Sequence, residues 1–301
     1  MNREVTRREF SRLAGAALGA SCLAGRAALA APARRLKIGH TGITWGYAPA
    51  NAEQAIKDIG AQGFSGFESF GNVIESWEAK GGMAKLLEEA KMPLISAYCP
   101  VNLTNADTRA AEVAKIVNWG KLIKKNGGSV AVIGPNNVRR NSYDFAAAKP
   151  AIVATLNDMA KALADVGITG VLHQHTGTCV EVRDEVYAVM EAADTKYVKF
   201  GPDVGQLAKG GSDPVKIVKD FLPVIRHVHL KDWDGGPNWT GYCPLGKGKV
   251  DVAAILDLLE TQKELPIVMV ELDPDNPPMT PVQTVQITKD YLKKLGYTFR
   301  T

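Results

Sequence analysis

The chain has 301 residues, of which 46% are hydrophobic and 23% are charged, and its formal net charge is +4. This is ordinary globular composition with enough apolar surface for a large core, so it excludes an intrinsically disordered chain. A single α/β barrel, which has about 250 residues, fits this length.

The first thirty residues differ from the rest of the chain. The segment TRREF contains the pair Arg7 and Arg8, and an alanine-rich apolar run follows it. This pattern predicts a twin-arginine export signal over residues 1–30. The apolar run is shorter than the about 20 residues that span a bilayer, so we expect no stable membrane anchor. Lipoprotein processing at Cys22 is the alternative.

An export signal has two consequences. We expect a periplasmic or otherwise exported protein, with the twin-arginine export machinery as a partner. Removal of residues 1–30 would leave 31 basic and 30 acidic residues. A nearly neutral mature chain argues against nucleic-acid binding through bulk charge. The oligomeric state stays open, and an oligomer is compatible with the sequence.

Short apolar or β-branched runs recur behind the leader, about 33 residues apart. They predict strands at residues 36–41, 63–70, 93–99, 129–134, 170–175, 198–203, 226–232 and 266–272. Amphipathic segments predict helices at residues 52–62, 83–91, 111–127, 151–167, 182–194, 213–222, 252–262 and 282–296. This alternation predicts an α/β fold, a (β/α)₈ TIM barrel over residues 31–301. A doubly wound sheet is the alternative, but GHTGITWG lacks its Gly-rich dinucleotide pattern.

Four of the five histidines occur as two H-x-H pairs inside predicted strands. The pairs are His173 with His175, and His227 with His229. Residues two apart on a strand point to the same face, so each pair offers two imidazoles to one site. This arrangement is typical of a metal site.

The carboxyl ends of barrel strands converge at one mouth. The polar residues that this rule collects are His40, Glu68, His173, His175, Asp203, His227, His229 and Glu271. Burial of Asp203 or Glu271 among apolar residues is costly without a cation, and a divalent metal meets that need. In each H-x-H pair we expect one ligand and one substrate contact or supporting residue, while a hydrogen-bonded packing role is the alternative. Glu68 is either a substrate contact or part of a structural salt bridge.

The predicted mouth also contains aromatic and cationic candidates. One of three tryptophans is expected to stack on a sugar ring, with Trp45 as the candidate for substrate binding; the three are Trp45, Trp233 and Trp239. Lys231 and Asp232 form either a solvated ion pair or, through Lys231, a cation beside a developing oxyanion. The long irregular stretch 232–248 is a candidate lid.

Six segments in chain order carry a resemblance to a known family. They are IGHTGITWG, GFSGFES, LHQHTGT, FGPDVGQLAKGGSDP, RHVHLKDW with PLGKGKVD, and VMVELDP. Over residues 36–296 the chain resembles the sugar phosphate isomerase/epimerase superfamily with the xylose isomerase-like barrel, and most closely its inosose dehydratase branch. The resemblance implies one divalent metal ion held by His173, Asp203, His229 and Glu271. Mixed histidine and carboxylate ligation suits Mn²⁺, Co²⁺, Fe²⁺ or Zn²⁺.

Two positions depart from the pattern of these relatives. Epimerases of the superfamily carry glutamate on strand five, where this chain has His173, and this weakens a two-glutamate epimerisation. The strand-six motif usually contains a histidine where this chain has Gln206. As a substrate-binding residue, Gln206 can hydrogen-bond a hydroxyl group but cannot take up a proton.

The resemblance and the strand-end residues together predict metal-dependent enolisation of a keto-sugar or keto-cyclitol, followed by β-elimination. His175, Lys231 and Glu271 are the candidates for the base and acid that elimination requires, and His227 is a candidate substrate contact. A sugar isomerase or epimerase with the same enediolate chemistry is one alternative. A non-catalytic exported sugar-binding protein is another. A multi-metal DNA-repair endonuclease is disfavoured by the near-neutral charge of the mature chain.

Overall fold

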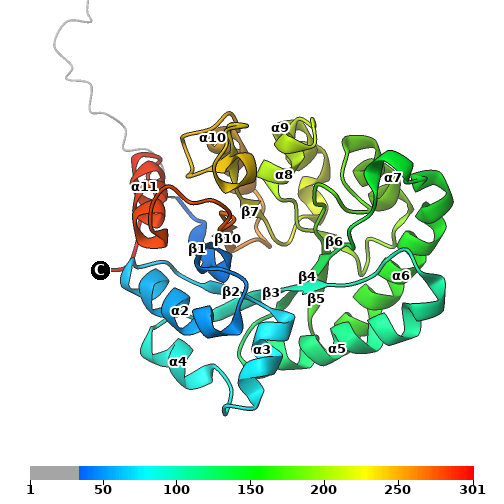
Figure 1. Cartoon of the computed structure of the whole chain (residues 1–301), viewed down its shortest axis with the longest axis horizontal. Coiled ribbons are helices and arrows are strands. Elements are labelled where there is room, and N and C mark those ends of the chain that lie inside the picture. Colours follow the sequence, from blue (N-terminus) through cyan, green and yellow to red (C-terminus); the bar gives the residue numbers. More distant parts are fainter. Residues whose placement is uncertain (1–33) are drawn as a thin grey trace, which may run out of the picture. The chain divides into compact units, whose positions relative to one another are not determined.

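The structure, a computed structural model, describes residues 34–301, so the predicted export signal at residues 1–30 lies outside the described residues. Figure 1 shows the strands at the centre of the fold with helices around them. Eight strands form one sheet in the order β6-β5-β4-β3-β2-β1-β10-β7. They are β1 (Lys37–Thr41), β2 (Phe67–Phe70), β3 (Leu94–Pro100), β4 (Val130–Gly134), β5 (Thr169–Leu172), β6 (Lys199–Phe200), β7 (His229–Leu230) and β10 (Ile267–Val270).

Isolated bridges join the two ends of this parallel sheet and close the barrel. Phe200 at the end of β6 bridges Ile225, and Asp203 bridges His229 of β7. The amide of His229 donates a hydrogen bond to the carbonyl oxygen of Pro202 at 3.0 Å. Pro202 has no N–H group of its own, so the ladder breaks there and β6 stays short. Each predicted strand segment is confirmed, as is the xylose isomerase-like TIM barrel.

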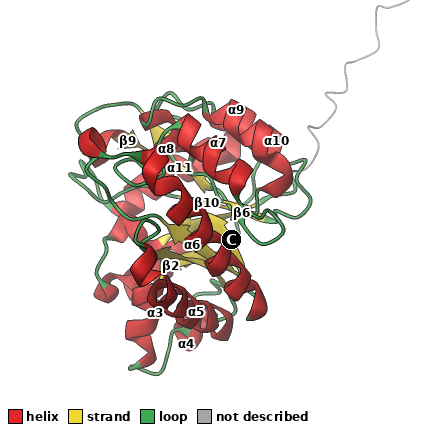
Figure 2. Cartoon of the chain, turned by 90° about the vertical axis from the view of Figure 1, so that its right-hand side faces the viewer, coloured by secondary structure: helices red, strands yellow, loops and turns green. Residues whose placement is uncertain are grey.

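The helices lie outside the strands, as Figure 2 shows. They are α2 (Ala52–Ala61), α3 (Gly71–Glu78), α4 (Ala84–Glu89), α5 (Arg109–Lys125), α6 (Phe145–Asp165), α7 (Arg183–Ala192), α8 (Val204–Lys209), α9 (Pro214–Phe221), α10 (Val252–Leu259) and α11 (Pro281–Lys294). The sequence pattern predicts all of these except the short helices α3 and α8. Between residues 34 and 301, no helix combines the length and the apolar character needed to cross a membrane.

Helix α6 begins six residues before its predicted start at residue 151. Asp144 caps it, since the Asp144 side chain accepts a hydrogen bond from the amide of Ala147 at 3.0 Å. The helix then continues through Pro150. Proline removes one backbone hydrogen bond from the helix. Capping and the buried face of the helix outweigh that loss.

The interior of the barrel changes from apolar to polar along the strands. Val130, Val132 and Val171 form a small apolar cluster against which Tyr98 packs. Beside it, Ser96 and Glu68 are buried polar residues at directly paired positions of β3 and β2. The inward face therefore carries apolar side chains on β4 and β5 and, level with them, polar side chains on β2 and β3.

His40 is buried on the outer side of β1, not at the barrel mouth. Thr41 lines the pocket at the mouth, so its neighbour His40 points to the opposite face. Its ring packs edge-on against Phe64 and Trp45, with centroids 5.2 and 5.8 Å away. Burial lowers the pKa of His40 to about 4, although its Nδ1 lies 2.8 Å from the carbonyl oxygen of Thr41. His40 is a packing residue.

We predict that His40 makes the stability of the fold depend on pH. An unfolded histidine titrates near pH 6.5, about 2.5 units above the folded value, so the unfolded chain takes up the proton first as the pH falls. The stability that neutral His40 provides is complete above pH 6.5 and is lost progressively towards pH 4, by about 3 kcal/mol. The variant His40→Asn keeps a donor but has no titrating ring.

Urea denaturation at a series of pH values measures this difference. His40→Asn is expected to be less stable than the wild type at pH 7, because ring packing is lost. Between pH 7 and pH 4 it should lose about 3 kcal/mol less of its unfolding free energy than the wild type does. Parallel stability curves for the two proteins would contradict the prediction.

Candidate metal centre and active site

Four residues at the carboxyl ends of strands form the centre of the site. His173 follows β5, Asp203 follows β6, His229 opens β7 and Glu271 follows β10. All four side chains are buried. His173, Asp203 and His229 each place one potential ligand atom within 4.8 Å of those of the other two. The fold therefore brings together the residues that the sequence predicts as metal ligands.

Several polar atoms of this group have no hydrogen-bond partner. They are His173 Nδ1, Asp203 Oδ2 and His229 Nδ1. His229 Nδ1 lies 2.9 Å from Glu271 Oε2, but the two atoms are not aligned for a hydrogen bond. Buried polar atoms almost always have a partner, and a cation satisfies several lone pairs at once. This set of two imidazoles and two carboxylates fits a divalent metal of the Mn²⁺ to Zn²⁺ series.

Asp203 uses one carboxylate oxygen for the fold and leaves the other for the site. Oδ1 caps α8 by accepting hydrogen bonds from the amides of Gly205 and Gln206, both at 2.9 Å. Gly205 is needed because a Cβ atom there would lie 2.6 Å from Cγ of Lys231. The cap thus holds Oδ2 in place beside Lys231.

The site contains more buried acid than buried base. Glu68, Asp203, Glu271 and Asp273 are buried, and Lys231 is the one buried lysine among residues 34–301. Burial opposes the ionisation of Glu271, but His229 and Lys231 lower its pKa well below the usual value. Burial raises the pKa of Asp203 in spite of Lys231. A further positive charge is therefore needed to keep every carboxylate ionised.

The two histidines of the centre differ in their surroundings. Burial and the neighbouring His229 lower the pKa of His173 well below its usual value, so its imidazole is neutral. Burial acts in the same direction on His229, but Glu271 and Glu68 outweigh it and raise the pKa of His229 well above normal. A metal ion binds neutral imidazole, so it would displace a proton from this position.

Lys231 is enclosed by carboxylates. Its Nζ donates a hydrogen bond to Glu271 Oε1 at 2.6 Å and lies 2.9 Å from Asp273 Oδ2 and 3.2 Å from Asp203 Oδ2. The ring of Tyr242 covers it, with the centroid 4.5 Å away. Burial is outweighed by these carboxylates, which raise the pKa of Lys231 well above its usual value. This placement argues against the predicted acid–base role and favours a role in holding the carboxylates.

The side chains of His175 and Gln206 form a hydrogen bond with each other. Gln206 Oε1 accepts hydrogen bonds from the amide and the hydroxyl of Thr176, at 3.2 and 2.7 Å. Its amide nitrogen therefore faces His175 Nε2, 2.7 Å away, and this nitrogen must accept. His175 Nδ1 then carries the proton and donates to the carbonyl oxygen of Thr176 at 2.7 Å.

This network restricts two predicted roles. Both ring nitrogens of His175 are engaged, although His175 lines the pocket, so the predicted role as acid or base would require Gln206 to move. Both polar atoms of the Gln206 side chain are also engaged, and Gln206 is not among the pocket-lining residues. The geometry gives Gln206 the role of orienting His175, in place of the predicted substrate contact.

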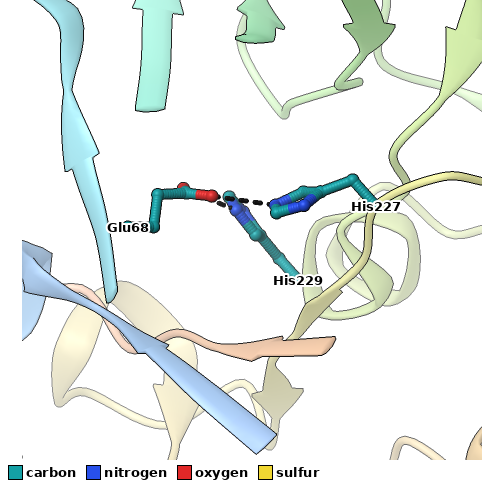
Figure 3. A group of neighbouring side chains, drawn as sticks. All are labelled: Glu68, His227 and His229. Atoms are coloured by element: carbon teal, nitrogen blue, oxygen red, sulfur yellow. Dashed lines mark hydrogen bonds and ion pairs between the residues drawn. The ribbon is translucent and has the colours of Figure 1, made fainter. Parts of the chain in front are cut away.

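The carboxylate of Glu68 faces the rings of both His227 and His229, as Figure 3 shows. Its Oε1 is 2.7 Å from His229 Nε2, and its Oε2 is 2.8 Å from His227 Nε2. The hydroxyl of Ser96 donates to Oε2 at 2.5 Å. Both oxygens are therefore engaged, which favours the ion-pair alternative for Glu68. His227 does not line the pocket, and this argues against its predicted contact with substrate.

Trp45 is turned away from the site. Its indole N–H donates a hydrogen bond to Asp58 of α2 at 2.8 Å, and its ring contacts His40. This placement argues against the predicted stacking on a sugar ring. Trp239 packs with Tyr242 and Leu272, and Trp233 joins the same cluster. All three tryptophans are packing residues in this structure.

A pocket of about 510 Å³ opens beside the four central residues. Its lining consists of Thr41, Ile43, Tyr47, Glu68, Ser69, Phe70, Tyr98, His173, His175, Glu271 and Asp273. Sequence reasoning missed Tyr98 and Asp273. The signal was present in the strand alternation, since Asp273 stands two residues after Glu271 and Tyr98 two residues after Ser96.

Asp232 anchors the long segment that was a candidate lid. Its side chain points away from Lys231 and accepts four backbone amides. The donors are Trp233 and Val250 to Oδ1, at 2.9 and 3.1 Å, and Gly246 and Gly248 to Oδ2, at 3.0 and 2.9 Å. The segment also contains the antiparallel pair of β8 (Asp232–Trp233) and β9 (Tyr242–Cys243). Neither the solvated ion pair nor the mobile lid describes this arrangement.

Known proteins are similar to this chain in sequence and in fold. A family profile described as the xylose isomerase-like TIM barrel matches residues 53–295. The chain belongs to this family. An inosose dehydratase from Clostridium botulinum (strain Alaska E43 / Type E3) is 25% identical over 268 residues, which cover 80% of this chain and 89% of that protein. A second inosose dehydratase, from Clostridium beijerinckii (strain ATCC 51743 / NCIMB 8052), is 24% identical over 272 residues and covers 81% and 90%.

Solved structures share the fold of this xylose isomerase-like barrel. The IolI protein with a bound zinc atom superposes with a TM-score of 0.69 at 15% identity, over 87% of this chain and 98% of that one. The 3-keto-D-glucoside 4-epimerase YcjR from E. coli superposes with a TM-score of 0.66 at 16% identity, over 86% and 98%. At this identity the likeness establishes the fold.

We predict that Asp232→Asn destabilises the protein by about 2 kcal/mol, because an amide nitrogen would replace one carboxylate oxygen and face two N–H donors. Asp251→Asn is the matched control. Asp251 caps α10 through one hydrogen bond from Ala254 at 3.0 Å, which an amide oxygen can still accept. The control should stay within about 0.5 kcal/mol of the wild type. If the two substitutions lower the unfolding free energy equally in chemical denaturation, the four amides that donate to Asp232 contribute no more to stability than an ordinary helix cap.

Proposed function

We propose that the protein is an exported, metal-dependent enzyme that enolises a keto-sugar or keto-cyclitol and eliminates a β-oxygen from it. The observation that carries the proposal is the set of His173, Asp203, His229 and Glu271, with unpartnered ligand atoms beside a pocket of about 510 Å³. Similarity to inosose dehydratases supports a sugar-modifying enzyme, and the IolI protein, which shares this fold, has a bound zinc atom, which supports metal binding.

The pocket walls suit a sugar-like ring. Phe70 and Tyr98 line it, with ring centroids 5.9 Å apart, and offer an apolar surface to C–H groups. Glu271 and Asp273 line it too and offer acceptors for hydroxyl groups. Bound by the four central residues, a divalent cation supplies Lewis acidity for the substrate carbonyl.

Asp273 is the residue of the pocket to which we assign removal of the α-proton. Its Oδ2 is held 2.9 Å from Lys231 Nζ, while no hydrogen bond within residues 34–301 engages its Oδ1. Glu271, the carboxylate predicted for this step, keeps Oε1 on Lys231 and turns Oε2 towards His229. Asp273 therefore has a free oxygen in the pocket, and Glu271 serves as ligand.

Elimination also needs a proton donor at the leaving oxygen. The hydroxyl groups of Tyr47 and Tyr98 belong to side chains that line the pocket. Burial raises the pKa of both, so each keeps its proton at neutral pH. We assign donation to an oxygen of the substrate to these hydroxyl groups.

His173 favours elimination over epimerisation. Two-base epimerisation requires a second carboxylate or another free base opposite the first. The end of β5 provides His173, which is neutral and belongs to the ligand group, and His175, whose nitrogens are both engaged. A two-base epimerase therefore lacks its second base, whereas an isomerase that moves one proton with a single base stays an alternative. A non-catalytic sugar-binding protein is the other alternative, and the experiments below distinguish it from an enzyme.

Export rests on the sequence of residues 1–30 alone. The twin arginines and the alanine-rich run support passage through the twin-arginine machinery to the periplasm or an equivalent compartment. That machinery carries folded proteins, which agrees with a metal centre assembled before export.

We predict that the cation-loaded protein catalyses exchange of an α-proton. Proton NMR in D₂O of a panel of keto-sugars and inososes should show deuterium uptake or loss of the α-proton with loaded protein, and none after chelation. His229→Ala should abolish both cation binding and exchange, because it removes one ligand. His40→Asn is the matched control and should retain both. Cation binding and ligand binding without exchange anywhere in the panel would favour the sugar-binding protein.

Asp273→Asn is predicted to lower the exchange rate by about 10²-fold or more, the usual contribution of a positioned base, and to leave cation affinity within a fewfold of the wild type. Asp144→Asn provides the control, because Asp144 is exposed, does not line the pocket and accepts one hydrogen bond from the amide of Ala147, which an amide oxygen can still accept. Exchange at the wild-type rate in Asp273→Asn would remove Asp273 from the mechanism and return the assignment to Glu271.

A further inference from the structure

We propose that Glu68 is a positioning residue that fixes which nitrogen of His229 faces the metal-ligand group, so that the cation affinity of the site depends on Glu68. The inference rests on the proposed function for the existence of the metal. It gives a specific role to a buried carboxylate that the proposed reaction does not otherwise use.

The hydrogen bond from His229 to Glu68 defines the tautomer of the imidazole. An ionised carboxylate can only accept, so the proton of the Glu68–His229 contact lies on His229 Nε2, 2.7 Å from Glu68 Oε1. In the neutral ring the lone pair is then on Nδ1. That atom is the one without a hydrogen-bond partner, 2.9 Å from Glu271 Oε2.

Glu68 is itself held in place by groups that face both of its oxygens. His229 Nε2 lies 2.7 Å from Oε1, and His227 Nε2 lies 2.8 Å from Oε2, which is the environment of an ionised carboxylate. Ser96 is the directly paired residue on β3 and donates its hydroxyl to Oε2 at 2.5 Å. Two neighbouring strands therefore fix the carboxylate, and through it the plane of the His229 ring. Figure 3 shows this contact from β2 across to the histidine pair.

Two other roles for Glu68 make different demands. A substrate contact needs a free carboxylate oxygen, and both oxygens are engaged, by His229 and by Ser96 with His227 nearby. A second metal site at Glu68, His227 and His229 would use three ligand atoms that lie within 4.8 Å of one another. It would require His229 Nε2 to give up the proton that it donates to Glu68. The observed hydrogen bond favours positioning.

The test is the Co²⁺ and Zn²⁺ affinity of the full-length protein, measured by chelator competition, together with the visible absorption spectrum of the Co²⁺ form. Glu68→Gln keeps the shape of the side chain but removes its charge and one acceptor. We expect a dissociation constant raised about 10- to 100-fold and an altered spectrum, the range for loss of a carboxylate behind a histidine ligand. Exchange activity should return towards the wild-type rate at saturating cation.

Ser96→Ala provides a second, milder variant that keeps the proposal testable if Glu68→Gln does not fold. It removes only the hydroxyl that supports Glu68, and we expect a dissociation constant raised about fivefold, the effect of one ordinary hydrogen bond. Thr155→Val is the control, since it also removes a buried hydroxyl, on α6 near Arg109, far along the chain from the site. It should leave cation affinity unchanged.

Three outcomes would overturn the inference. Cation affinity in Glu68→Gln within threefold of the wild type would show that Glu68 does not position the ligand. Unchanged affinity with lost turnover would make Glu68 a substrate contact or catalytic residue. Two cations per wild-type chain, with one lost in Glu68→Gln, would establish the second metal site. If the wild-type protein binds no divalent cation, the proposed function is wrong, and the inference is wrong with it.

Discussion

The structure depends on the concentration of negative charge inside the barrel. Glu68, Asp203, Glu271 and Asp273 are all buried, and Lys231 forms ion pairs with Asp203, Glu271 and Asp273. Uncompensated carboxylates at this depth would cost several kcal/mol each. The surrounding fold supplies part of the compensation through Lys231, through backbone amides at Asp203, and through His229 and Ser96 at Glu68. In the proposed function a divalent cation completes this compensation, and the proposed chemistry uses the same charge.

The carboxylates of the centre divide their two oxygens between fold and function. Asp203 gives Oδ1 to the start of α8 and keeps Oδ2 for the site. Glu271 gives Oε1 to Lys231 and turns Oε2 towards His229. This division explains why so short a helix as α8 starts at Asp203 and why a lysine is buried beside metal ligands. Asp273 differs, because its Oδ1 makes no hydrogen bond within the described residues, and for this reason we propose it as the group that removes the α-proton.

Periodicity and strand-end position were enough to predict the barrel and all eight strand segments, and they place His173, Asp203, His229 and Glu271 among eight strand-end candidates. The choice of these four as metal ligands came from the resemblance to the sugar phosphate isomerase/epimerase superfamily. The same rule erred at His40, because the phase of β1 depends on Thr41 facing inward, which the sequence of that strand does not reveal. It also missed Asp273, although Asp273 stands two residues after Glu271 and the strand alternation therefore predicts that both face the same side. Hydrogen-bond saturation of Lys231, Gln206 and His175 depends on tertiary contacts, so no spacing pattern could predict it.

The most direct test of this account is anomalous diffraction from crystals of the protein grown with Mn²⁺, Co²⁺ or Zn²⁺, recorded at the absorption edge of the metal. The account predicts one peak per chain, surrounded by His173, Asp203, His229 and Glu271. Lys231 Nζ should still donate its hydrogen bond to Glu271 Oε1. A peak between Glu68 and His227, or fully loaded crystals with no peak at the barrel mouth, would contradict it.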